Sequence, residues 1–338
     1  MAQSRPRMIA TEEAFAIPEY FEAFKKLPTV STHMGLRNAA RFYGAPGNVE
    51  RLTDIEVRLA EMDQYGVDMH LLSLTSPGVQ IFDADMGTSL AALANDRLAG
   101  FIKQYPKRFS GLAAVAPQDP QRAAAEIERA MVHLGLNGII INSHTDGKFL
   151  DEPQFAPILE AAVKYGAPIY LHPTFPSQTM EQPFERYGMN SAIWAFGAEC
   201  SLHAVRMILG GVFDRYPELQ IVLGHMGEGI PFWLYRLDDL HSTLMAFKKP
   251  PEDIVKLKRL PSEYFKDNFH ITTCGMLSTP ILNFCIEVLG IDRLIFSIDY
   301  PYGFTGKSTE FILNTPLQAA YRAKILHSNA ERVFKITP

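Results

Sequence analysis

The feature that most constrains this fold is a series of eight short apolar runs, each followed by a segment with helical periodicity. The runs are rich in β-branched residues and are apolar throughout instead of alternating, which is typical of strands buried on both faces. They span residues 8–11, 69–74, 111–115, 138–141, 168–171, 219–223, 269–273 and 294–298. Strands that alternate with helices indicate a parallel sheet, and eight such units predict a closed (β/α)₈ TIM barrel of the α/β class. An open doubly wound sheet is the alternative, but no glycine-rich phosphate loop follows the first run.

Two connections between these units are unusually long, and they are of the kind that form lids or binding loops over a barrel. They cover residues 17–53 after the first run and residues 174–191 after the fifth. The last segment, residues 315–335, is predicted to be a helical tail that closes the bottom of the barrel, with Thr315 as its cap and Pro316 at its first position. We expect residues 1–338 to form a single domain.

Composition excludes several classes of protein. The chain has 338 residues, with 32 Lys and Arg against 37 Asp and Glu, and this net charge of −5 lacks the basic footprint of a nucleic-acid binder. The three cysteines form no C-x-x-C motif, which indicates a reduced compartment without a disulfide framework. No apolar run is long enough to span a membrane, and the first residues show no secretory signal, so we expect a cytoplasmic protein.

Polar side chains that can bind a metal stand at the ends of four of the predicted strands. They are Glu12 (or its neighbour Glu13), His172, His225 and Asp299. Each has an ordinary structural explanation when taken alone, as a cap, a turn residue or a hydrogen-bonded histidine. Because active sites of these barrels lie at the carboxyl ends of the strands, the four are expected to converge on one mouth. Their joint placement therefore predicts a metal site.

Four motifs carry a family resemblance over nearly the whole chain. They are T-E-E-A-F at 11–15, Y-L-H-P at 170–173, L-G-H-M-G-E at 223–228 and S-I-D-Y-P at 297–301. These motifs resemble the amidohydrolase superfamily, and within it the non-oxidative aromatic-acid decarboxylases, the branch that includes aminocarboxymuconate-semialdehyde decarboxylase. The segments 73–80 and 141–152 are most similar to the 5-carboxyvanillate decarboxylases within that branch. The resemblance implies a carbon–carbon lyase.

The resemblance also implies roles for individual residues. Metal ligands would be Glu12, His172 and Asp299, and His225 with its supporting carboxylate Glu228 would join Asp299 in catalysis. The residues that the resemblance places against substrate are Arg236, Tyr302, Thr75 and, from the first long connection, Arg51 or alternatively Arg41. Hydrolytic relatives carry H-x-H on the first strand, whereas this chain has Glu12 and Ala14 at those positions.

One imidazole and two carboxylates form a mainly hard ligand set, which suits one divalent ion. The resemblance favours Mn²⁺, with Mg²⁺ or Zn²⁺ as alternatives. The resemblance implies that the substrate is an ortho-hydroxy aromatic acid, 5-carboxyvanillate-like or dihydroxybenzoate-like, which could chelate such an ion through its phenolate and carboxylate. We expect Asp299 to deliver a proton to the ring carbon before CO₂ leaves, because direct loss would create an unstable aryl anion.

Two other functions remain open from the sequence. A metal-dependent hydrolase of an ester, lactone or amide could use the same residues, and a catalytically inactive barrel could serve as a binding module. The expected partner is a small aromatic carboxylic acid, with no nucleic acid or membrane. The resemblance implies a homodimer or homotetramer, in which Arg236 could reach a neighbouring subunit.

Overall fold

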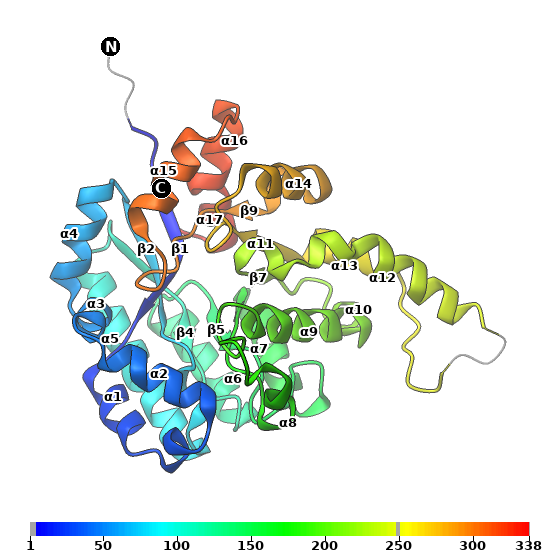
Figure 1. The fold of residues 1–338 in the computed structure, drawn as a ribbon, viewed down its shortest axis with the longest axis horizontal. Coiled ribbons are helices and arrows are strands. Elements are labelled where there is room, and N and C mark those ends of the chain that lie inside the picture. The colour runs from blue at the N-terminus through cyan, green and yellow to red at the C-terminus, as the bar shows by residue number, and fades with distance from the viewer. Residues whose placement is uncertain (1–4, 248–250, 338) are drawn as a thin grey trace.

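Parallel strands form the centre of the molecule, and helices surround them (Figure 1). The computed structural model describes residues 5–247 and 251–337. The strands of this part are β1 (Ile9–Phe15), β2 (Met69–Leu74), β3 (Phe109–Gly111), β4 (Ala113–Ala114), β5 (Ile139–Asn142), β6 (Ile169–His172), β7 (Ile221–Leu223), β8 (Phe269–Thr272) and β9 (Leu294–Ile295). Each strand falls within or overlaps one of the predicted apolar runs, which confirms the predicted strand order.

Hydrogen bonds close these strands into a barrel. Leu112 alone separates β3 from β4, and its N–H donates to the Leu72 carbonyl while the next N–H, of Ala113, donates to Gly138. β3 and β4 are therefore one barrel strand that passes from one neighbour to the other. At the seam, the Ala14 N–H donates to the Tyr300 carbonyl at 2.7 Å, which joins β1 to the segment after β9. The predicted (β/α)₈ barrel is confirmed.

The helices lie around the barrel and across its two ends (Figure 1). They are α1 (Pro18–Lys25), α2 (Met34–Gly44), α3 (Asn48–Thr53), α4 (Ile55–Tyr65), α5 (Ala84–Gln104), α6 (Pro120–Glu128), α7 (Ala156–Tyr165), α8 (Gln178–Glu181), α9 (Ala195–Leu209), α10 (Val212–Arg215), α11 (His225–Glu228), α12 (Ile230–Met245), α13 (Pro261–Asn268), α14 (Thr279–Leu289), α15 (Thr305–Asn314), α16 (Ala319–Ala323) and α17 (Asn329–Val333). Figure 1 shows that α12 projects away from the barrel.

The long connection predicted after the first strand exists, but most of it is helical. α1, α2 and α3 fill it, with Pro18 in the first turn of α1, where its missing N–H costs nothing. Tyr43 of α2 packs edge-to-face on Phe21 and Phe24 of α1, with ring centroids 5.0 and 5.2 Å apart. This segment is therefore a packed helical cap over one side of the barrel mouth. The second long connection contains only the short α8 and a 3₁₀ turn at Gln182–Phe184.

The helical tail closes the bottom of the barrel, as predicted. Ala330, Phe334 and Ile336 pack against side chains of the barrel interior. The interior side chains in this cluster come from six of the strands and from Leu112, and are Ile9, Met69, Leu71, Leu112, Ile140, Tyr170, Val222 and Ile295.

The predicted start of the tail is wrong. Thr315 does not cap a helix, because its hydroxyl donates back to the Phe311 carbonyl at 2.8 Å, at the end of α15. The next helix, α16, has Gln318 at its cap position.

Candidate active site

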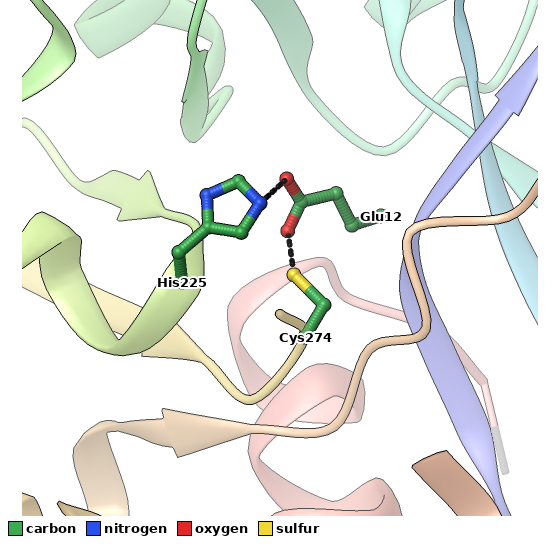
Figure 2. A group of neighbouring side chains, drawn as sticks. All are labelled: Glu12, His225 and Cys274. Carbon is green, nitrogen blue, oxygen red and sulfur yellow. Dashed lines mark hydrogen bonds and ion pairs between the residues drawn. The ribbon is translucent and has the colours of Figure 1, made fainter. Parts of the chain in front are cut away.

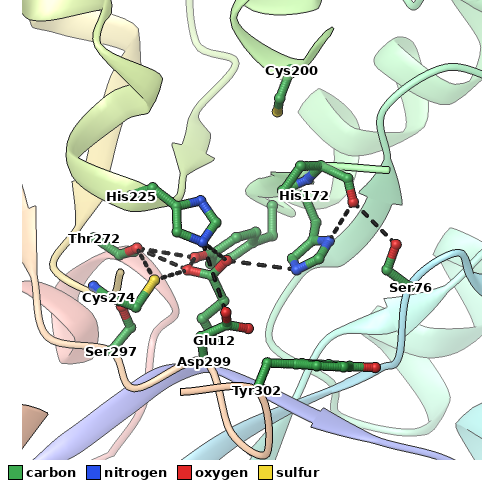
Figure 3. A network of polar contacts seen from close by, with 12 residues as sticks. Glu12, Ser76, His172, Cys200, His225, Thr272, Cys274, Ser297, Asp299 and Tyr302 are labelled. Carbon is green, nitrogen blue, oxygen red and sulfur yellow. Dashed lines mark hydrogen bonds and ion pairs between the residues drawn. The ribbon is translucent and has the colours of Figure 1, made fainter. Parts of the chain in front are cut away.

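Four strand ends bring Glu12, His172, His225 and Asp299 together at the mouth of the barrel (Figure 3). Glu12 lies within β1, His172 ends β6, and His225 and Asp299 follow β7 and β9. Glu12 Oε1 lies 3.6 Å from His172 Nε2 and 3.8 Å from His225 Nε2. His225 Nε2 is also 3.8 Å from Asp299 Oδ2. The structure thus brings together all four side chains that the strand-end argument selects.

The two oxygens of Glu12 have different surroundings. Oε2 accepts hydrogen bonds from the Tyr170 hydroxyl, from Thr272 Oγ1 at 2.9 Å and from Cys274 Sγ at 2.7 Å (Figure 3). Oε1 is buried and has no hydrogen-bond partner among the described residues. Because burial of an unpaired carboxylate oxygen is costly, Oε1 calls for a partner that approaches from the mouth.

His172 directs its Nε2 toward Glu12 Oε1. Its Nδ1 lies 2.8 Å from the Pro173 carbonyl, which can only accept, so Nδ1 carries the proton and donates. The Nε2 lone pair is then left for a metal ion, in the arrangement usual for metal-binding histidines. The candidate ligand atoms of Glu12, His172 and Asp299 all lie within 4.8 Å of one another. One imidazole nitrogen and two carboxylate oxygens fit a divalent cation with a preference for hard ligands.

His225 is held by a left-handed turn that begins where β7 ends. The φ angles of His225, Met226 and Glu228 are 50°, 55° and 51°, and that turn folds the Glu228 carboxylate back onto the ring. Glu228 Oε1 lies 2.7 Å from His225 Nδ1. A side chain at the preceding Gly224 would come within 2.8 Å of Glu12 Oε1, so glycine is required there.

Electrostatics at the mouth favour an ion pair between Glu12 and His225. Burial disfavours a charged Glu12, but His225 and His172 outweigh it and lower the pKa of this carboxyl. Burial likewise disfavours the imidazolium of His225, but Glu228, Cys274 and Glu12 raise its pKa well above the ordinary value. Burial raises the pKa of Asp299, and His225 opposes that rise. Asp299 is thus the acid of the group whose protonated form is favoured.

Asp299 is fixed by its neighbour on the first strand, Glu13. The Glu13 carboxylate accepts the backbone N–H groups of Ile298 at 2.9 Å and Tyr300 at 3.1 Å, on either side of Asp299. Asp299 itself has a φ of 68°, in the left-handed region that L residues rarely adopt. Of the two glutamates weighed from the sequence, Glu12 therefore faces the mouth, and Glu13 binds the backbone that carries Asp299.

Two of the predicted substrate residues lie together above the mouth. Thr75 Oγ1 and the Tyr302 hydroxyl are 2.5 Å apart. The Tyr302 ring packs against Phe42 of α2, with centroids 4.6 Å apart, so the helical cap contributes to this wall of the site. The side chain of Tyr302 remains 37% exposed, which leaves its ring open to a ligand.

The arginines predicted from the first long connection bind other groups of the protein. Arg51 binds Glu61 at 3.0 and 3.1 Å and the Pro301 carbonyl at 3.0 Å. Arg41, the alternative, is near the end of α2 with Nη1 3.5 Å from Asn38 Oδ1. The structure thus gives Arg51 protein partners that a substrate would have to share.

Arg236 lies on α12 and shares a cavity with Glu228. It is exposed on α12 and lines a cavity of about 840 Å³, together with Glu228, Trp233 and residues of α9. Among the described residues, no hydrogen bond or ion pair joins Arg236 to Asp299.

The side chains that orient Glu12 were not among the residues predicted from the sequence. Tyr170 comes from β6. Thr272 and Cys274 come from the end of β8, a strand for which no site residue was predicted. The position of Thr272 and Cys274 at a strand end was the available signal. The fact that both turn inward toward Glu12 follows only from the closed barrel.

Comparisons with known proteins identify similar chains that cover most of this one. A family model described as amidohydrolase matches residues 47–336. A γ-resorcylate decarboxylase from a Polaromonas species is 36% identical over 295 residues, which cover 85% of this chain and 89% of that protein. The crystal structure of 5-carboxyvanillate decarboxylase from Sphingomonas paucimobilis is 47% identical with a TM-score of 0.94, covering 98% of this chain and 100% of that one.

A second solved structure comes with ligands. The 5-carboxyvanillate decarboxylase from Novosphingobium aromaticivorans, complexed with manganese and 4-hydroxy-3-methoxy-5-nitrobenzoic acid, is 39% identical with a TM-score of 0.94, covering 99% of this chain and 97% of that one. The resemblance inferred from the motifs is confirmed.

Proposed function

The chain belongs to the amidohydrolase family, and from that premise we propose that it is a metal-dependent carboxy-lyase acting on an ortho-hydroxy aromatic acid. The observation that carries the proposal is the convergence of Glu12, His172 and Asp299 beside His225. The decarboxylases among its relatives support the reaction class, and those named for 5-carboxyvanillate support a substrate of that type. A dihydroxybenzoate-like acid is the alternative substrate.

We propose that Glu12, through Oε1, His172, through Nε2, and Asp299 hold one divalent ion. Mn²⁺ is favoured by the hard ligand set and by the manganese in a solved relative, with Mg²⁺ or Zn²⁺ as alternatives. When bound, such an ion polarises the oxygens of the substrate and stabilises negative charge on them. The anchored Oε2 of Glu12 keeps the other oxygen directed at the ion.

Asp299 is proposed to supply the proton. Direct loss of CO₂ would leave an aryl anion, whereas protonation of the carbon that bears the carboxylate avoids it. A carboxylate beside a divalent ion is ionised, so Asp299 would first take this proton from the substrate or from water within the site and then pass it to the ring carbon. His225 Nε2, 3.8 Å from Asp299 Oδ2, is placed to hydrogen-bond the substrate and assist the transfer, while Glu228 fixes the ring through Nδ1. Contacts to the remaining phenolic and anionic groups are proposed for Thr75, Tyr302, Arg51 and Arg236.

A homodimer or homotetramer is proposed on the basis of α12. Phe232 and Tyr235, next to Arg236, are 75% and 81% exposed on this projecting helix. Large exposed aromatic side chains are typical of interfaces between subunits. A neighbouring copy on this face is how Arg236 could reach a second active site.

The described residues contain no helix with the length and apolar character that a membrane span requires.

The experiment that tests the function is an assay in D₂O with added Mn²⁺. The acids are 5-carboxyvanillate, 2,6- and 2,3-dihydroxybenzoate and salicylate, followed by ultraviolet absorbance and NMR. We expect CO₂ release, with one deuterium at the carbon that carried the carboxylate, and the fastest substrate identifies the subfamily. No turnover with metal confirmed bound, together with hydrolysis of an ester or lactone panel, would instead support the hydrolase.

A further inference from the structure

A thiol at the floor of the candidate active site orients Glu12 but has no chemical step in the proposed decarboxylation. Cys274 follows β8 and is fully buried, yet its Sγ lies 2.7 Å from Glu12 Oε2 (Figure 2). On the other side of the carboxylate, His225 Nε2 is 3.8 Å from Glu12 Oε1. The candidate ligand atoms of Glu12, His225 and Cys274 all lie within 4.8 Å of one another. Three separate strand ends thus bring sulfur, nitrogen and oxygen to one point.

We propose that Glu12, His225 and Cys274 form a second cation site, which takes thiophilic divalent ions such as Zn²⁺ or Cd²⁺ and inhibits the enzyme when it is filled. The site is distinct from the Glu12, His172 and Asp299 group, although the two share Glu12. Only the inhibition rests on the proposed function, because ion binding can be measured without turnover.

The side chains of this second group are already turned toward one another. Glu228 binds Nδ1 of His225 at 2.7 Å, which leaves Nε2 as the nitrogen that faces Glu12 and Cys274. Glu12 is 3% exposed, and its Oε1 has no hydrogen-bond partner among the described residues. A cation between the three would satisfy an oxygen that the protein itself leaves unpaired.

The chemistry of the ligands separates the two groups. Carboxylate and water ligands suit Mn²⁺, whereas a cysteine sulfur selects softer ions, and a mixed S, N, O set is typical of Zn²⁺. Without such an ion, the thiol of Cys274 donates to Glu12 Oε2. On binding, the ion takes the place of the thiol proton of Cys274 and of the Nε2 proton of His225. Bonds form from sulfur and from nitrogen to the ion, and both protons leave to solvent. No electron transfer is involved.

Binding at this site would remove two parts of the proposed machinery at once. Glu12 would serve the thiophilic ion in place of Mn²⁺, and the Nε2 lone pair of His225 would be occupied. We therefore expect Zn²⁺ to inhibit in competition with Mn²⁺, and a chelator followed by Mn²⁺ to restore activity.

The first test is spectroscopic and uses the metal-free protein titrated with Cd²⁺. A thiolate bound to Cd²⁺ gives an ultraviolet charge-transfer band that carboxylate and imidazole ligands do not give. We expect this band in the wild type and in Cys285→Ser, whose thiol is buried on α14 away from the mouth. We expect no band in Cys274→Ser, which keeps a hydroxyl that can donate to Glu12. Absence of the band in the wild type, or an equal band in Cys274→Ser, would overturn the proposal.

The second test is inhibition of the Mn²⁺-loaded enzyme by Zn²⁺, with each variant normalised to its own uninhibited rate. Loss of the sulfur ligand should raise the Zn²⁺ concentration for half-inhibition by at least about tenfold, equivalent to ~1.4 kcal/mol of binding free energy. Equal inhibition of the wild type and Cys274→Ser would contradict an inhibitory role for this site. If none of the aromatic acids is turned over, the proposed function fails, and the Cd²⁺ band still decides the cation site.

Discussion

The buried carboxylate of Glu13 accepts the backbone N–H of Tyr300 at 3.1 Å, across the seam where the barrel closes. Its other oxygen accepts the N–H of Ile298 at 2.9 Å. Asp299 lies between these two residues with a φ of 68°, a conformation that is costly for an L residue. One side chain of the first strand therefore holds both ends of the strained peptide that carries the proposed proton donor.

We expect Glu13→Gln to disturb the position of Asp299 while it leaves the side chains of Glu12 and His172 in place. The amide of glutamine has one accepting oxygen, so one of the two backbone N–H groups loses its partner, at a cost of about 1–3 kcal/mol. The melting temperature should fall, and kcat should fall more than KM changes. Thermal unfolding and steady-state kinetics check this result, with Glu22→Gln on the exposed face of α1 as a control that should match the wild type. A Glu13→Gln enzyme with unchanged kcat would show that the Glu13 contacts do not position Asp299.

Asp299→Asn should remove the proton donor while keeping the size of the side chain. General acid catalysis contributes about 10²–10⁴-fold to the rate, so we expect kcat to fall by at least about 10²-fold. Mn²⁺ content must be measured alongside the rate, since Asp299 is also a proposed metal ligand. An active Asp299→Asn enzyme that retains its metal would assign the proton to another group.

Glu228→Gln tests the support of His225. The carboxylate 2.7 Å from Nδ1 is a main reason that the pKa of His225 is raised, so the amide should lower that pKa. Loss of such a supporting partner typically costs about 10–100-fold in activity. We expect a loss in that range, and a pH–rate profile in which the limb assigned to His225 moves to lower pH. A profile with that limb unmoved would exclude His225 as the titrating group.

The order of the barrel strands could be predicted from the sequence because each strand is a local apolar run. β1 was the exception, since it continues past its apolar run through Glu12 and Glu13 to Phe15. Two adjacent carboxylates do not predict a buried strand. They are buried here because their partners come from other parts of the closed barrel, the Tyr170 hydroxyl of β6 for Glu12 and the Tyr300 backbone across the seam for Glu13.

The candidate site shows the same division. Strand-end position was enough to select Glu12, His172, His225 and Asp299, because parallel strands end at one mouth. It could not distinguish the roles of Glu12 and Glu13, since the inward or outward direction of each depends on closure of the barrel. Nor could it place Arg236, which is exposed on α12 and lines a cavity with Glu228.

Glu199 gives a prediction that is independent of the metal. It is 1% exposed on α9, accepts a hydrogen bond from Ser143 Oγ at 2.9 Å, and burial raises its pKa from 4.5 to about 8. A group whose pKa is raised by folding binds its proton more tightly in the folded state. Its contribution to stability is therefore complete below pH 4.5 and is lost as the pH rises through about 8.

Glu199→Gln should remove this loss, because an amide stays neutral at every pH. At pH 5 the variant and the wild type should unfold at similar temperatures, whereas at pH 8.5 the variant should be the more stable, by an upper bound of about 5 kcal/mol. Thermal unfolding of the metal-free proteins across this range measures the difference. Glu160→Gln, on the exposed side of α7, should follow the wild-type curve at both pH values. Parallel curves for Glu199→Gln and the wild type would mean that Glu199 is charged in the folded protein at neutral pH, and that its surroundings stabilise the carboxylate.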